Sequence, residues 1–154
     1  MFIMNFPNLK QLLWSKYKVI DMLRKRDIPQ DLIPADTDDM DTWELQIFRA
    51  PAICKIKEIH LIPAGDIGQG TNYMTLSVQD KGTDTILTSL DVNSTHTIEG
   101  NVGVNLLSED KELAKGYVLT LKKEVTGDGQ LFPGGLVQVF YEIVDKTYLN
   151  STMR

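Results

Sequence analysis

The side chains that could do chemistry in this chain are a single cysteine, Cys54, and two histidines, His60 and His96. Cys54 and His60 share one predicted strand, and strict alternation along a strand places both on the same face. Zinc accepts a thiolate and an imidazole, but the sequence offers no further obvious ligands beside this pair. We therefore interpret Cys54 as a small buried apolar residue and His60 as a hydrogen-bonded residue of the sheet.

Covalent catalysis by Cys54 or by a serine would need a base beside the nucleophile, in a cleft. No set of acid, base and metal-ligating residues converges in the sequence, so we predict a protein that is not an enzyme and has no cofactor. The lone cysteine excludes a disulfide within the chain and fits synthesis in a reducing cytoplasm.

An acidic run at residues 36–41 superficially matches a calcium-binding loop. The match fails at three positions, because Met40 replaces a ligand, Asp41 stands where glycine makes the sharp turn, and Ile47 replaces the bidentate glutamate. The run is therefore predicted to be a solvated linker that holds no metal.

The chain has 154 residues, of which 42% are hydrophobic, and this is enough to bury one sizeable core without disulfides or metals. A net charge of -5 leaves no overall basic field, so nucleic acid is not an expected partner. No apolar run approaches the ~18 residues of a membrane span, and the short apolar start lacks the basic leader and cleavage site of a secretion signal.

Residues 8–26 form a predicted amphipathic helix, which Asn5 or Asn8 can cap. Apolar residues recur along it at spacings of three and four and share one face. This predicted partner-binding stripe consists of Leu9, Leu12, Leu13, Tyr17, Ile20 and Leu23. The stripe either folds back on the chain's own domain or contacts a partner.

The composition divides the chain into three parts: an N-terminal helical segment over residues 1–27, a connector over 28–42 and a β domain over 43–154. Pro29, Pro34 and five aspartates in the connector oppose regular structure and favour an extended, solvated chain. Such a tether lets the helix reach a neighbouring molecule. We therefore expect the stripe to bind copies of this chain, with a trimer favoured, or another protein.

From residue 43 onward, alternating apolar and polar residues separated by turn residues predict strands. The predicted strands are residues 43–49, 53–62, 73–79, 85–92, 100–107, 117–123 and 136–144, with 108–115 as a connection at the edge of the sheets. This pattern predicts a mainly β protein, an antiparallel β-sandwich of the jelly-roll or immunoglobulin type.

Several short blocks of this β region carry a resemblance to a known class of protein. They are Arg49-Ala50-Pro51-Ala52, Ile59-His60-Leu61-Ile62-Pro63-Ala64-Gly65-Asp66, Gly70-Thr71-Asn72-Tyr73, Thr75-Leu76-Ser77-Val78-Gln79, Lys81-Gly82, Gly116-Tyr117-Val118-Leu119, Thr126-Gly127-Asp128-Gly129 and Pro133-Gly134-Gly135-Leu136-Val137-Gln138-Val139. Together they resemble small β-sandwich structural proteins of tailed-phage virions, over about residues 49–140.

The resemblance implies a head decoration or head-fibre protein of the virion, made in the host cytoplasm, attached to the major capsid protein and without catalytic residues. A tail-associated structural component is the alternative within the same class. The N-terminal helix and the connector lie outside the matching region, so the resemblance assigns them no role.

A carbohydrate-binding sandwich is an alternative from another class, because aromatic residues on a sheet can stack on sugar rings. The candidates are Trp43, Tyr73, Tyr117 and Tyr141. Trp43 and Tyr141 lie near predicted strand ends, where aromatic residues commonly close a core. Glycan contact therefore ranks second, and a virion protein could also make it.

Overall fold

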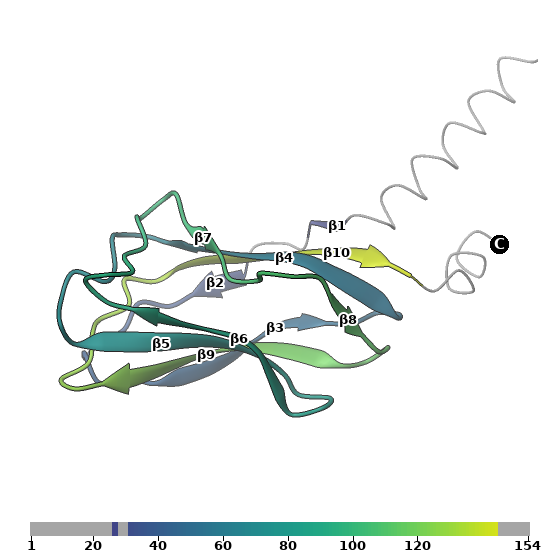
Figure 1. The fold of residues 1–154 in the computed structure, drawn as a ribbon, viewed down its shortest axis with the longest axis horizontal. Helices are drawn as coiled ribbons and strands as arrows, with labels where there is room; N and C mark the ends of the chain where they lie inside the picture. Colours follow the sequence, from purple (N-terminus) through teal and green to yellow (C-terminus); the bar gives the residue numbers. More distant parts are fainter. Residues whose placement is uncertain (1–25, 28–30, 145–154) are drawn as a thin grey trace, which may run out of the picture.

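Two antiparallel sheets pack face to face in the computed structural model, which describes residues 26–27 and 31–144 (Figure 1). The six-stranded sheet has the order β1-β10-β4-β7, with β2 beside β10 and β8 beside β4, and the four-stranded sheet has the order β3-β9-β5-β6. The strands are β1 (Arg26–Asp27), β2 (Asp31–Ile33), β3 (Trp43–Arg49), β4 (Cys54–Pro63), β5 (Tyr73–Asp80), β6 (Thr85–Val92), β7 (Val104–Asn105), β8 (Lys111–Leu113), β9 (Val118–Thr126) and β10 (Gly135–Ile143).

The predicted mainly β fold and antiparallel sandwich are confirmed. No helix occurs in the described residues. The helix predicted over residues 8–26 lies outside them except for its last residue, Arg26, which instead pairs with Tyr141 of β10.

The core forms because alternate residues of facing strands point into the space between the sheets. On β9, Leu119 and Leu121 are fully buried, and on β10 the inward residues are Val137, Val139, Tyr141 and Ile143. Each apolar side chain of this size contributes about 1.5–3 kcal/mol when it leaves water.

A β-bulge in β4 changes which residues face the core. Phe140 of β10 is opposite Glu58 and Tyr141 is opposite Ile56, so Lys57 is an extra residue between them. Lys57 and Glu58 therefore both point outward, and the alternation resumes in the opposite phase. Strict alternation had placed Cys54 and His60 on one face, and this prediction is wrong because of the bulge.

Residues 31–42 differ from the extended, solvated connector that their composition predicts. Residues Asp31–Ile33 form β2 and pair with Val137–Gly135 of β10, and the Ile33 side chain is buried in the core. The side chain of Asp36 is also buried, in an ion pair with Lys123. This part of the chain belongs to the sandwich, because backbone pairing and a counter-ion outweigh its poor strand composition.

Two predicted elements between residues 100 and 115 also differ from the structure. The strand predicted over 100–107 is reduced to the two residues of β7, and the connection predicted over 108–115 contains the short strand β8. Both short strands pair with β4, along different parts of its length.

Candidate functional site

The first and the last described residues lie at the same end of the sandwich. Arg26 and Asp27 lie opposite Tyr141 and Phe140, close to the last residue of β10, Ile143. The segments 1–25 and 145–154 therefore both join the sandwich at this end, which is on the right in Figure 1. We call this end, together with the loops 50–53, 81–84 and 114–117, the terminal pole.

The opposite end consists of four loops, residues 34–42, 64–72, 93–103 and 127–134, which we call the loop pole. Hydrogen bonds tie these loops to one another. The Gly68 amide donates to Gln130 Oε1 at 3.1 Å, and the Gly100 amide donates to Asp66 Oδ1 at 2.7 Å. Ile67 and Ile98 exchange two backbone hydrogen bonds of 3.0 Å. The loops thus form one connected surface.

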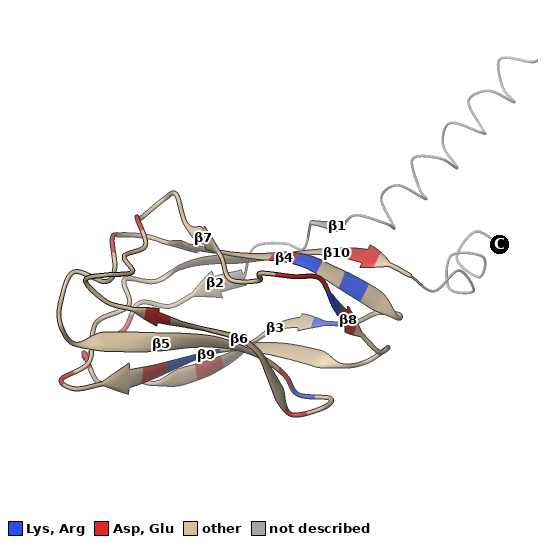
Figure 2. Cartoon of the chain, viewed as in Figure 1, with Lys and Arg blue, Asp and Glu red and all other residues tan. Residues whose placement is uncertain are grey.

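The charged residues of the loop pole are all acidic. Its four loops contain no lysine or arginine, and their carboxylates are Asp36, Asp38, Asp39, Asp41, Asp66, Glu99 and Asp128. Most are exposed. The strands and the terminal pole carry both signs of charge, as Figure 2 shows. The loop pole is therefore a negatively charged end on a molecule of mixed surface charge.

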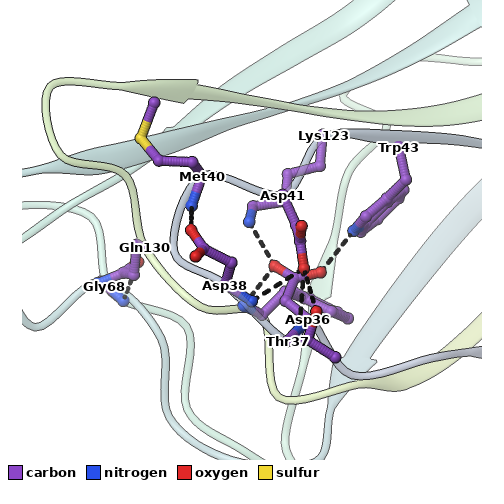
Figure 3. A network of polar contacts seen from close by, with 10 residues as sticks. Asp36, Thr37, Asp38, Met40, Asp41, Trp43, Gly68, Lys123 and Gln130 are labelled. Carbon is purple, nitrogen blue, oxygen red and sulfur yellow. Dashed lines mark hydrogen bonds and ion pairs between the residues drawn. The ribbon is translucent and has the colours of Figure 1, made fainter.

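A buried ion pair lies beneath the loop pole, between Lys123 of β9 and Asp36 of the loop 34–42 (Figure 3). The exposed fractions of the two side chains are 0% and 2%. Two further donors reach the carboxylate: Trp43 Nε1 donates to Asp36 Oδ1 at 2.9 Å, and the Phe132 amide donates to Oδ2 at 2.8 Å. Every oxygen of the buried carboxylate is thus satisfied.

The remaining residues of the acidic run form a self-contained turn. Asp41 Oδ2 accepts hydrogen bonds from the amides of Thr37 and Asp38, at 2.8 and 2.9 Å, and these two bonds lower the pKa of Asp41. Asp38 Oδ1 accepts from the Met40 amide. Within residues 26–27 and 31–144, no three His, Cys, Asp or Glu side chains are grouped so as to hold a metal ion.

Cys54 and His60, the two residues considered as zinc ligands, lie in different environments. Cys54 is fully buried in the core, and burial, with a smaller effect of the Glu112 carboxylate, raises the pKa of its thiol to about 11. His60 points outward, where Nε2 lies 2.9 Å from Glu58 Oε2 and the ring contacts Phe140. The structure does not bring Cys54 and His60 together.

The aromatic residues considered for sugar stacking do not share a surface. Tyr141 is buried and packs against Phe48, with ring centroids 4.9 Å apart. Trp43 packs edge-on against Phe132 and donates its N–H to Asp36. Tyr73 begins β5 at the loop pole, whereas Tyr117 precedes β9 at the terminal pole.

Lys123 was not among the candidate residues predicted from the sequence, although the strand pattern contained a signal for it. Lys123 has the same phase as Leu119 and Leu121 in the alternation of one strand, so it should point inward. An inward lysine requires a buried counter-charge. The acidic run contained that counter-charge, and only the fold shows that Asp36 is the residue involved.

The residues of the predicted partner-binding stripe lie outside the described part of the chain. No protein-family model matches the chain, and a search of curated proteins finds no match. Among the residues that the structure describes, no helix is long and apolar enough to cross a membrane.

Proposed function

We propose that this chain is a non-catalytic structural protein of a phage virion, of the head decoration or head-fibre type. It attaches through its terminal pole and presents the acidic loop pole outward. The observation that carries the proposal is that segments 1–25 and 145–154 both join the sandwich at one end, away from the loop pole. A domain that is connected at one end can be attached there and expose its opposite end on the surface of a particle.

The charge distribution supports this orientation. Like charges on the loop poles of neighbouring copies repel each other within about one Debye length, ~8 Å at physiological ionic strength. The terminal pole has no excess of one sign of charge. Lys81 and Asp84 lie in one of its loops, and Glu112 lies opposite Lys55 on the adjoining strands. Copies therefore gather more readily through the terminal pole than through the loop pole.

The contacts of attachment are assigned to the stripe predicted from the sequence, Leu9, Leu12, Leu13, Tyr17, Ile20 and Leu23. Its partners are other copies of the chain, with a trimer favoured, and the major capsid protein. An apolar stripe binds by removing its surface from water, and a few central residues supply most of the binding energy. The virion is the proposed location.

Co-sedimentation with capsids stripped of accessory proteins tests attachment. The full chain should pellet with the capsids, and the double variant Leu13→Asp/Ile20→Asp should remain in the supernatant with its sandwich folded. Lys18→Asp is the matched control, because it introduces the same side chain on the predicted polar side of the helix. Failure of the parent chain to pellet contradicts attachment, and pelleting of the double variant contradicts the role of the stripe.

A further inference from the structure

The buried pair of Lys123 and Asp36 has the features of a site that makes a covalent bond. The Lys123 ammonium contacts the carboxylate of Asp36, and both side chains are shielded from water. We propose that the two residues condense after folding, so that an amide bond joins Nζ of Lys123 to Cγ of Asp36. This inference is independent of the proposed role in a virion.

Proximity is the first requirement for this reaction, and the fold supplies it. Lys123 is held by β9, which pairs with β3 on one side and with β5 on the other. Asp36 is held by hydrogen bonds from its own amide to the Phe132 carbonyl and from the Phe132 amide to its carboxylate. Fixed reacting groups behave as if their concentration were about 10⁵–10⁸ M.

Polarisation of the carboxyl group is the second requirement. The Trp43 indole N–H lies 2.9 Å from Oδ1, where negative charge develops when the amine attacks the carbonyl carbon. The Phe132 amide holds Oδ2, the other oxygen, at 2.8 Å. The two oxygens therefore have different partners and different roles: Oδ1 stays as the amide oxygen, and Oδ2 leaves.

The reaction balances without any oxidant, reductant or activating group. A proton passes from the Lys123 ammonium to the Asp36 carboxylate, which gives a neutral amine and a carboxylic acid. The Nζ lone pair attacks Cγ, the Nζ–Cγ bond forms, and the Cγ–Oδ2 bond breaks. Oδ2 departs as water with the carboxyl proton and one amine proton, so the chain loses one water molecule.

Burial favours the product of the reaction. Two charges in a dry environment cost free energy. The product replaces two buried charges with one neutral amide. The exposed pairs Lys57–Asp110, Lys111–Glu109 and Lys122–Glu124 have water at hand, which keeps their groups charged and favours hydrolysis.

Mass spectrometry of the denatured full chain tests the proposal. The expected mass is lower than the sequence mass by one water. Trypsin should release a branched peptide in which residues 27–49 and 123–146 are joined, since a modified Lys123 resists cleavage. A mass equal to the sequence mass, measured on protein that unfolds cooperatively, overturns the proposal.

Cyclisation at Asp128-Gly129 would remove the same mass, so the position of the bond must be mapped. Loss of water without the branched peptide also overturns the proposal. Lys123→Arg should restore the full sequence mass, whereas Lys57→Arg at an exposed pair should leave the loss of water unchanged. Asp36→Asn keeps the carbonyl carbon and should lose one ammonia in place of water.

Discussion

The ammonium of Lys123 lies against the carboxylate of Asp36, which is 87 residues earlier in the chain. Lys123 comes from the inner face of the four-stranded sheet, and Asp36 from the segment that leads from β2 to β3 and so passes from one sheet to the other. The pair fixes this crossing segment at the loop pole, where Phe132 and Trp43 bind the same carboxylate. Stability and the arrangement of the loops therefore depend on one buried contact.

Lys123→Met is expected to reduce the free energy of unfolding by at least about 3–5 kcal/mol, because it leaves the Asp36 carboxylate buried without its counter-charge and also removes the proposed amide bond. Urea denaturation of the parent and the variant measures this difference. Lys57→Met, which breaks the exposed pair with Asp110, is the control and should leave the denaturation midpoint nearly unchanged. Equal effects of the two substitutions would show that Lys123 is not the structural anchor.

Gly129→Ala is expected to destabilise the protein more than Gly116→Ala. Both glycines have positive φ angles, 73° and 85°, so alanine costs about 1–2 kcal/mol of backbone strain at either position. At Gly129 the new Cβ would also lie 2.1 Å from the Asp39 carbonyl oxygen, whereas nothing lies within 4 Å at Gly116. Thermal unfolding of both variants compares them, and equal melting temperatures would refute the close approach of the two loops.

The decrease in the free energy of unfolding at acidic pH should depend in part on Glu44. Hydrogen bonds from Lys81 and Thr120 lower the pKa of this carboxyl below 4.5. A lowered pKa in the folded state stabilises the protein above the unfolded pKa, and this contribution is lost as the pH falls through the lowered value. Glu44→Gln should therefore reduce stability at neutral pH by less than about 1 kcal/mol, since the pair is partly exposed.

The measurement for Glu44 is the free energy of unfolding at a series of pH values for parent and variant. The two curves should converge in acid. A constant separation at all pH values would mean that the charge of Glu44 contributes nothing.

The Cys54 thiol should be unreactive in the folded protein. Burial raises its pKa to about 11, and no part of its side chain is exposed to a reagent. Labelling with a thiol reagent should proceed only in denaturant, at a rate that follows unfolding. Rapid labelling of the native protein would contradict the burial of the β4 end, where Cys54 pairs with Leu113.

The six long strands, β3 to β6, β9 and β10, could be predicted from the sequence because alternation reports directly on a half-buried strand. The predicted bounds of β3 and β6 match the structure, those of β5 differ by one residue at one end, and those of β4 and β10 differ by one residue at both ends. Which residues of β4 face the core could not be predicted, since the bulge at Lys57 depends on how β10 pairs with β4. Strand content is thus a local property, whereas the inward face depends on pairing.

The structure of the connector, residues 28–42, could not be predicted from its composition. Aspartates and prolines in residues 28–42 favour an extended chain, yet Asp36 is buried because Lys123 supplies a charge from a distant strand. Composition describes a segment in isolation and cannot reveal such a partner. One practical consequence is that a truncation starting at residue 43 would remove β1, β2 and Asp36, so the N-terminal segment must be tested by substitution in the full chain.

Light scattering during size-exclusion chromatography of the full chain tests the central claim, that the chain assembles through its N-terminal stripe. The parent chain should elute as a closed oligomer, with a trimer favoured, and Leu13→Asp/Ile20→Asp should elute as a monomer with the same urea denaturation midpoint. A monomeric parent chain, or a double variant with the oligomer intact, would contradict assembly through this stripe.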